Sequence, residues 1–353
     1  MELHPKFRLN GKAYTHKSLL DAAQTWTKDS DAAQNTLGTF LVDWLSDGKM
    51  ILLQTSGSTG TPKTLEMPKA AMRASAERTG AFFKLSPGNT ALLCLPVAYI
   101  AGKMMLVRAL ILGLDLDIIA PKTKLDLQGK TYDFAALIPL QAAENLHQLA
   151  QIKTILIGGA PIAEALRKKI HETHPNCMET YGMTETLTHV ATRPVTYPTP
   201  PFTAMPDVGI SLDSDSCLTL NVPYISKEPI QTNDIVERVD ENAFSLLGRR
   251  DFVINSGGKK IFPEQLEEKL RPHLNIPFFF TGIPDAQLGE KLVLILEGIA
   301  KDSAHALKIA TTLLGNDKHH VPKAVFYVRA FVYTPSGKLD RKGTKDLVKR
   351  QSL

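Results

Sequence analysis

Short apolar runs alternate with stretches of helical periodicity through the first half of the chain. The run Met50–Gln54 (MILLQ) precedes small, turn-forming residues, and the alanine-rich stretch 69–83 follows with helical spacing, which predicts strand, loop and helix in that order. Further strands are expected at 91–95, 116–119, 134–138 and 154–157, with helices at 104–112 and 163–173 between them. This alternation predicts an α/β domain with a largely parallel sheet.

The pattern changes after residue 194. Residues 194–206 are rich in proline and threonine, and the strands expected beyond them, at 235–239 and 244–247, are short and alternating. The last hundred residues indicate a separate small α+β unit, with a helix at 263–270 and a strand at 291–297. We place the boundary at 249–251, which gives a large domain over residues 1–249 and a C-terminal domain over 250–353.

The composition is that of a soluble globular protein: 353 residues, 43% hydrophobic and 22% charged. The net charge of +5 is modest and bases are interleaved with acids, so no nucleic-acid partner is required. The three cysteines lack the spacing of a zinc site or a disulfide framework. No leader-like segment opens the chain, and no apolar run reaches the roughly 18 residues of a membrane span. We therefore expect a cytoplasmic protein without a membrane span, of unknown oligomeric state.

A loop of small hydroxyl residues, TSGSTGTPKT, occupies residues 55–64. Gly57 and Gly60 give its backbone freedom, its N–H and O–H groups could surround phosphate oxygens, and Lys63 adds a positive charge. It is not a Walker A loop, because Pro62 precedes the lysine and the glycines are three apart. A solvated turn explains a loose match of this kind about equally well.

Two further strings carry groups suited to a nucleotide. The apolar run ILIGGAP at residues 155–161 ends in two glycines, which let backbone approach a flat ligand, although a tight strand-to-helix turn is an equal explanation. The string YGMTET follows at 181–186. There Tyr181 offers an aromatic face, Thr184 a hydroxyl for a phosphate and Glu185 a carboxylate for a hard divalent cation. Glu185 could instead be a surface acid.

Together with PSGKLDR at residues 335–341, the strings SGSTGTPK and YGMTET resemble the motifs of the adenylate-forming superfamily. That superfamily includes acyl-CoA synthetases, aryl-CoA ligases, peptide-synthetase adenylation domains and luciferases. The resemblance implies a large N-terminal α/β domain with a small mobile α+β C-terminal domain. It also implies a ligase that adenylates a carboxylic acid with ATP and Mg²⁺ and passes the acyl group to CoA. Few residues precede the loop, so the large domain would be shortened at its N-terminus.

The resemblance also implies a role for each motif. The residues of the loop that would bind the β and γ phosphates of ATP are Thr55, Ser56, Ser58, Thr59 and Lys63. The wall of the adenine site falls to Gly158, Gly159, Ala160 and Pro161, together with Tyr181. Thr184 would touch the AMP phosphate, Glu185 would bind Mg²⁺, and Lys338 would stabilise charge during adenylation.

Ribose and hinge residues are implied between these motifs. Asp234 stands where the superfamily has the aspartate that binds both ribose hydroxyls, although the usual Thr-Gly-Asp reads Thr-Asn-Asp here. Arg249 would add a ribose contact, and Asp251 would be the hinge between the domains. The stretch around Gly257 and Gly258 fits a glycine-rich hairpin with room for the pantetheine arm of CoA, and by itself it reads as an ordinary β-turn.

Within the superfamily, LPVAYIAGKMMLVRA and YGMTETLTHVATRP look most like the o-succinylbenzoate:CoA ligases of menaquinone biosynthesis, particularly short forms. Such a substrate needs an apolar slot and a cation for its second carboxylate. Lys103 and Arg108 are candidates for that cation, although both could be solvated helix charges. Thr188 and His189 could line the acyl pocket, and a structural histidine is an equal interpretation. Tyr99 stands where many relatives carry a histidine, so gating of the pocket is left open.

Two alternatives remain open at this point. The same chemistry could serve another aryl or acyl acid, or a carrier-protein thiol in place of CoA. The chain could also be a non-catalytic nucleotide-binding protein. The joint presence of Lys63, Glu185, Asp234, Arg249 and Lys338 favours an enzyme, because a binding module would not need the lysine near the far end.

Overall fold

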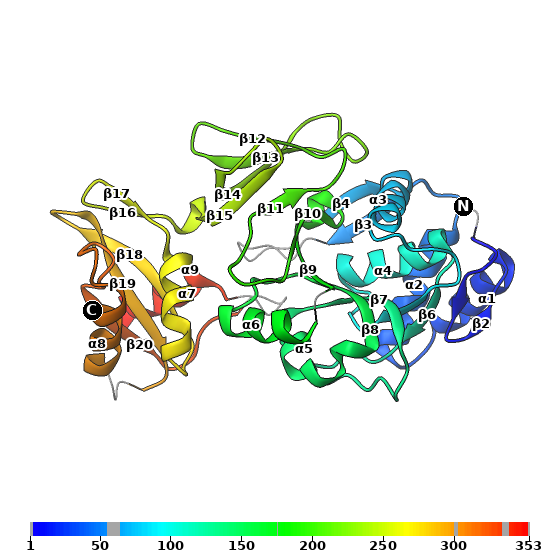
Figure 1. Ribbon diagram of the computed structural model, residues 1–353, viewed down its shortest axis with the longest axis horizontal. Coiled ribbons are helices and arrows are strands. Elements are labelled where there is room, and N and C mark those ends of the chain that lie inside the picture. Colours follow the sequence, from blue (N-terminus) through cyan, green and yellow to red (C-terminus); the bar gives the residue numbers. More distant parts are fainter. Residues whose placement is uncertain (1–2, 55–63, 175, 300–302, 334–338, 352–353) are drawn as a thin grey trace.

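The computed structural model describes residues 3–54, 64–174, 176–299, 303–333 and 339–351. The chain forms one large sheet with helices around it and a smaller C-terminal sheet with its own helices (Figure 1). Several predicted residues lie outside the described ranges: Thr55, Ser56, Ser58, Thr59, Lys63 and Lys338.

The large sheet has 13 strands in the order β12-β13-β14-β15-β11-β10-β9-β8-β7-β5-β6-β1-β2. Its parallel part comprises β1 (Arg8–Leu9), β5 (Thr90–Leu93), β6 (Asp115–Ile118), β7 (Tyr132–Leu137), β8 (Ile152–Ile157) and β9 (Cys177–Gly182). Its antiparallel strands are β2 (Lys12–Ala13), β10 (His189–Pro194), β11 (Phe202–Ala204), β12 (Gly209–Leu212), β13 (Cys217–Asn221), β14 (Ile230–Arg238) and β15 (Ala243–Arg249). The parallel half of the prediction is confirmed, and the short alternating strands extend the same sheet instead of starting another.

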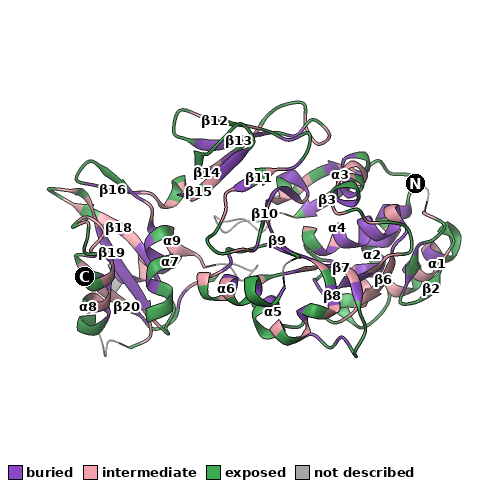
Figure 2. Cartoon of the chain, in the orientation of Figure 1, coloured by how far each residue is buried: buried purple, intermediate pink, exposed green. Residues whose placement is uncertain are grey.

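Helices bury both faces of the parallel part. The helices are α1 (His16–Trp26), α2 (Ala32–Leu45), α3 (Lys69–Phe82), α4 (Ile100–Leu112), α5 (Pro139–Glu144), the 3-10 helix η1 (Leu146–Gln151) and α6 (Glu164–Thr173). Successive residues of one strand join opposite cores: Phe134 packs in the cluster that includes α1 to α4, and Ala135 in the cluster that includes α5 and α6. The strands are accordingly buried, and the outer helix faces are exposed (Figure 2).

The expected order of strand, loop and helix at residues 50–83 is wrong in one respect. A second strand, β4 (Thr64–Pro68), follows the loop and pairs antiparallel with β3 (Met50–Gln54) before α3 begins. Residues 55–63 therefore connect two strands of a separate two-stranded sheet. The run is too short to be prominent in the sequence, but Met67 packs beside Ile51 and Leu53 in the core.

After β15 the chain passes through the 3-10 helix η3 (Arg250–Phe252) into the small sheet. Its strands are β16 (Ile254–Ser256), β17 (Lys259–Ile261), β18 (Phe278–Asp285), β19 (Gly289–Glu297) and β20 (Ala324–Val328). Its helices are α7 (Pro263–Leu270), η4 (Arg271–His273), α8 (Ser303–Leu314) and α9 (Arg341–Gln351).

The predicted α/β part and smaller α+β part are thus confirmed. We keep residues 1–249 and 250–353 as a proposed division into domains, because the chain leaves the large sheet there and the small sheet has separate cores. In the described part of the chain, no helix combines the length and apolar character needed to cross a bilayer.

Candidate active site

The neighbouring parallel strands β8 and β9 end at the same edge of the large sheet, and both predicted nucleotide strings extend from the last residues of these strands into the segments that follow. In open α/β sheets the carboxyl ends of strands are where ligands bind. A Cβ at Gly158 would lie 2.3 Å from Oγ1 of Thr180 on β9, so a side chain there would have to displace this hydroxyl. Gly159 has φ +85°, which disfavours any other residue. The backbone conformation therefore favours glycine at position 159, and crowding by Thr180 favours it at position 158.

Tyr181, Asp234 and Arg249 meet although they are far apart in sequence. The Tyr181 hydroxyl donates to Oδ2 of Asp234 at 2.6 Å, and Arg249 donates from Nη1 to Oδ1 at 3.1 Å. The tyrosine ring packs against Phe202 and Phe244. Burial, followed by the Asp234 charge, raises the pKa of Tyr181, so it remains a neutral donor. The carboxylate is therefore fixed from both sides, as a group that positions a polar ligand must be.

The residues predicted for the phosphate and Mg²⁺ follow β9 in the 3-10 helix η2 (Thr184–Thr186). Thr186 fixes this turn, because its Oγ1 accepts a hydrogen bond from the Met183 N–H at 2.9 Å. The turn ends at Leu187, whose φ of +63° is uncommon for a residue other than glycine. Glu185 is exposed. Within the described ranges, no three His, Cys, Asp or Glu side chains gather around a possible metal. A Mg²⁺ ion that is bound by one carboxylate and by the phosphates of the substrate needs no cluster of three protein ligands. Glu185 alone therefore fits the predicted role of magnesium ligand.

Three of the predicted acyl-pocket residues form one buried cluster. Arg108, which is 2% exposed, donates from Nη2 to Oγ1 of Thr188 at 2.6 Å, and that oxygen lies 3.1 Å from Nδ1 of His189. Arg108 Nε and His189 Nε2 are buried without hydrogen-bond partners in the described structure. No ion pair of Arg108 is found among the described residues, and burial lowers its pKa to about 10. The interpretation of Arg108 as a solvated helix charge is wrong.

Lys103 lies elsewhere. It is five positions before Arg108 on α4, which places it about 140° away around the helix. Its Nζ donates to the carbonyl oxygens of Val97 and Ala98 at 2.8 Å each. Burial lowers the pKa of Lys103. Tyr99 is exposed at the start of the same helix. The structure therefore brings Arg108, but not Lys103, to Thr188 and His189.

Burial of His189 predicts a pH dependence of stability. Burial, followed by the charge of Arg108, lowers the pKa of His189 from 6.5 to about 3. The unfolded chain thus binds a proton that the folded chain does not, so this stability is complete above pH 6.5 and is lost as the pH falls towards 3. We expect His189→Asn to reduce the loss of unfolding free energy between pH 7 and pH 5 by on the order of 2 kcal/mol. Urea unfolding at pH 7 and pH 5 measures this loss. An equal loss of unfolding free energy in His189→Asn and in the wild-type chain would contradict the prediction.

A buried ionic cluster behind the adenine turn was missed from the sequence. Glu179 of β9 pairs with Arg167 of α6 and accepts from Nε of Arg193 at 2.7 Å. It also lies 3.4 Å from the backbone nitrogen of Ile162, at the end of the turn. The alternation along β9 could have indicated that Glu179 is buried. Cys177, Glu179 and the buried Tyr181 are alternate residues of one strand, so their side chains lie on the same face of the sheet.

The predicted hairpin at Gly257 and Gly258 is confirmed. Strands β16 and β17 pair antiparallel, from Ile254 with Ile261 to Ser256 with Lys259. The two glycines have φ +57° and +79°, the left-handed values that a two-residue hairpin turn needs. The role of this hairpin stays a prediction.

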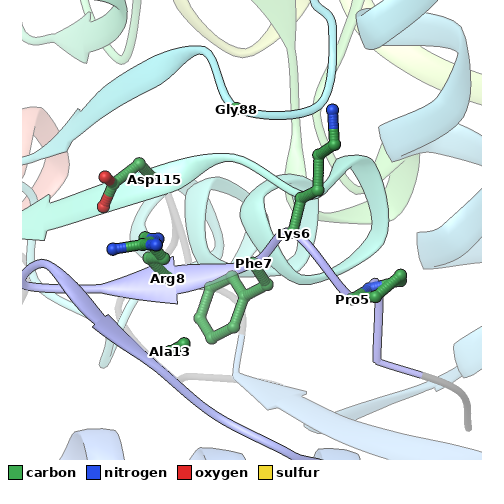
Figure 3. Close-up of a pocket in the computed structure, with 7 residues that line it drawn as sticks. All are labelled: Pro5, Lys6, Phe7, Arg8, Ala13, Gly88 and Asp115. Atoms are coloured by element: carbon green, nitrogen blue, oxygen red, sulfur yellow. The ribbon is translucent and has the colours of Figure 1, made fainter.

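A pocket of about 310 Å³ lies away from these residues, at the β1 and β6 side of the large sheet (Figure 3). It is lined by Pro5, Lys6, Phe7, Arg8, Ala13, Gly88 and Asp115. None of the predicted site residues lines this pocket, so it is separate from the candidate site.

Comparison with known proteins places the chain among enzymes. Residues 12–220 match the family described as AMP-binding enzyme. The chain is 26% identical over 371 residues to a probable 2-succinylbenzoate–CoA ligase of Mycobacterium tuberculosis, over 92% of this chain and 93% of the relative. It is 23% identical over 346 residues to the 2-succinylbenzoate–CoA ligase of Bacillus cytotoxicus, over 86% and 71% respectively.

Solved structures give the same result. An acyl-CoA synthetase (AMP-forming)/AMP-acid ligase II-like protein from Dyadobacter fermentans is 33% identical with a TM-score of 0.59, over 92% of this chain and 97% of that one. The o-succinylbenzoate CoA synthetase of Bacillus subtilis, in complex with its acyl-adenylate intermediate, has a TM-score of 0.78 at 17% identity, over 97% and 95%. The second likeness shows the fold alone. With the family match spanning more than half of its length, the chain belongs to the AMP-binding enzyme family, among the AMP-forming acid–CoA ligases of the adenylate-forming superfamily.

Proposed function

We propose that the protein ligates o-succinylbenzoate to CoA in the cytoplasm, as a step of menaquinone biosynthesis, with release of AMP and pyrophosphate. The observation that carries the choice of acid is Arg108, a buried guanidinium without an anionic partner in the described structure, beside Thr188 and His189. A buried cation without a counter-charge is costly, and a second substrate carboxylate would supply that charge. The names of the relatives from Mycobacterium tuberculosis and Bacillus cytotoxicus support the same acid.

The nucleotide would bind at the carboxyl ends of β8 and β9. Adenine would lie along the turn of Gly158, Gly159, Ala160 and Pro161, with Tyr181 beside it. Asp234 would accept hydrogen bonds from the ribose hydroxyls, with Arg249 as a second ribose contact. Support comes from the fixed carboxylate, which already accepts from Tyr181 and Arg249. The loop residues Thr55, Ser56, Ser58, Thr59 and Lys63 would hold the β and γ phosphates.

In the first half-reaction a carboxylate oxygen of the acid attacks the α-phosphorus of ATP. The bond to the bridging oxygen breaks, and pyrophosphate leaves with the electron pair. Thr184 would donate to the α-phosphate, and Lys338 would stabilise the negative charge that develops there. Glu185 would hold Mg²⁺, which spreads the charge of the phosphates when bound.

In the second half-reaction the thiolate of CoA attacks the acyl carbon, and AMP leaves. The hairpin at Gly257 and Gly258 would give the pantetheine arm room, because neither turn residue carries a side chain. This hairpin and Lys338 belong to the same C-terminal part but to different segments of it. Both cannot occupy one site at once, so the C-terminal part would turn about Asp251 between the half-reactions.

The test is CoA-dependent AMP formation from ATP and Mg²⁺, with o-succinylbenzoate compared with benzoate, a fatty acid and acetate. We expect turnover with o-succinylbenzoate that exceeds the other acids by at least about 10²-fold in kcat/KM, because only this acid carries both the ring and the second anion. Activity on another acid alone would discard this substrate and keep the chemistry. Turnover with a carrier-protein thiol but not with CoA would change the acceptor, and no turnover with any acid would favour the non-catalytic alternative.

A further inference from the structure

The segment that joins the large sheet to the small one is held by side chains of the large sheet. Arg250, the first residue of η3, donates from Nη2 to Oδ1 of Asn233 on β14 at 2.6 Å. Its Nη1 also lies 3.6 Å from Asp213 and 3.5 Å from Asp215, in the turn between β12 and β13. Three side chains of the large sheet therefore contact one residue of the connection.

The next residue is held as well. The carboxylate of Asp251 accepts from Arg249 Nη2 at 2.9 Å and lies 3.3 and 3.4 Å from the amide nitrogen of Asn233. Asn233 thus uses its oxygen toward Arg250 and its nitrogen toward Asp251. A glycine at position 233 could make neither contact, and glycine is the residue that the adenylate-forming motif has there.

The other groups that contact residues 249 and 250 are themselves fixed. Asp213 accepts from the backbone nitrogens of Asp215 and Cys217 at 2.9 and 2.8 Å, and from Gln231 Nε2 at 2.8 Å. On the other side of the connection, Glu264 of α7 accepts from the Arg249 backbone nitrogen at 3.1 Å. These anchors leave the connection little freedom in the present arrangement.

We infer that Asn233 is a positioning residue that holds the C-terminal part, through Arg250 and Asp251, in the orientation seen here. Any rotation about residues 250–251 must first break the Asn233 contacts. Asn233 therefore lowers the free energy of the orientation seen here relative to the orientation that the C-terminal part would reach after the rotation. Resting on the proposed function, the inference is that Asn233 sets the balance between acyl-adenylate formation and thioester formation. Loss of a hydrogen bond to a charged group at a half-exposed site corresponds to a shift of about fivefold in that balance.

The experiment compares Asn233→Ala and Arg250→Ala with the wild-type chain. Glu237→Ala is the matched control, because Glu237 is an exposed residue of the same strand far from the connection. Spin labels at Glu172→Cys on α6 and Lys308→Cys on α8, both exposed positions, report the distance between the two parts without substrate. The native cysteines Cys94, Cys177 and Cys217 are buried, which favours labelling of the introduced ones. Single-turnover rates of acyl-adenylate formation and of its thiolysis by CoA give the balance.

We expect both variants to shift the distance distribution and to change the ratio of the two rates by about fivefold, while Glu237→Ala does neither. The effect of the double variant should be smaller than the sum of the two single effects, because both substitutions remove the hydrogen bond between Asn233 and Arg250. Unchanged distances and an unchanged ratio would overturn the inference. If the distances shift but the wild-type chain forms no acyl-adenylate, the proposed function fails while the positioning role of Asn233 stands.

Discussion

Lys338→Ala is expected to slow acyl-adenylate formation by about 10²–10³-fold while the Kd for ATP stays close to the wild-type value. A preorganised positive charge at the reacting phosphate stabilises the transition state more than the ground state, so its removal lowers the rate and spares binding. Pyrophosphate release and ATP titration by calorimetry measure the two quantities. Lys342→Ala is the matched control, because Lys342 is an exposed lysine four residues further on, within α9.

Arg341, three residues after Lys338, is firmly attached to helix α7 of the C-terminal part. Arg341 donates to both oxygens of Glu267 at 2.7 and 2.6 Å, and its guanidinium lies 4.7 Å from the ring centroid of Phe252. A bidentate pair of this kind fixes direction as well as distance. Movement of the C-terminal part would therefore carry Arg341 with it. Pyrophosphate release at the wild-type rate in Lys338→Ala would remove Lys338 from the mechanism.

The same variant separates an enzyme from a nucleotide-binding protein without catalysis. In a binding protein, Lys338→Ala would alter neither the Kd for ATP nor any turnover, because none exists. In a ligase, binding survives and turnover falls. The result thus bears on the class of the protein as well as on one residue.

The core elements of the fold could be predicted because burial on both faces of a parallel sheet leaves an unmistakable pattern. Residues 134–138 and 154–157 are almost uniformly apolar, and residues 134–137 and 154–157 lie in β7 and β8. The strand β4 could not be predicted in the same way, because it is covered on one side only and has Met67 as its one buried residue. Sheet membership was also beyond the sequence: short antiparallel strands read as a change of architecture, yet hydrogen bonding continues from β9 to β10.

Site residues could be predicted where a local backbone conformation requires a particular residue type or where a sequence motif identifies the position. Gly159 and Gly257 both have a left-handed φ, so each position has a local reason to be glycine. The long-range contacts had none. Asp234 and Arg249 face each other only because β14 pairs with β15 in one register, and no spacing along the chain fixes that register.

The burial of Arg108 follows from the sequence of its helix. The helix 100–112 reads IAGKMMLVRALIL, apolar on almost every face, and such a helix is surrounded by protein. A charged residue in its second half must therefore be buried, whereas Lys103, near the start, can reach backbone carbonyls of the preceding loop. The two cations of this helix therefore differ: Arg108 is buried, and Lys103 is held by backbone oxygens.

Arg108→Met is expected to raise the Kd for o-succinylbenzoate by about 10²-fold, since it removes the partner of a buried anion. Benzoate, which lacks the second carboxylate, should bind the variant and the wild-type chain equally well. Removal of an unpaired buried cation should also leave the Tm unchanged or higher, because methionine fills a similar volume without a desolvation cost. Isothermal titration with both acids and a thermal melt measure these three quantities.

The combination of results decides between recognition and packing. A residue that only packs would lower the Tm on replacement and would weaken both acids together, because its effect would pass through the shape of the pocket. A residue that binds the second carboxylate weakens the diacid alone and does not destabilise the substrate-free fold. Lys103→Met serves as the comparison, because its Nζ is already engaged with two carbonyl oxygens and lies on another side of α4. If Lys103→Met, and not Arg108→Met, weakens the diacid selectively, the anion site belongs to Lys103, and His189 with Thr188 would be structural.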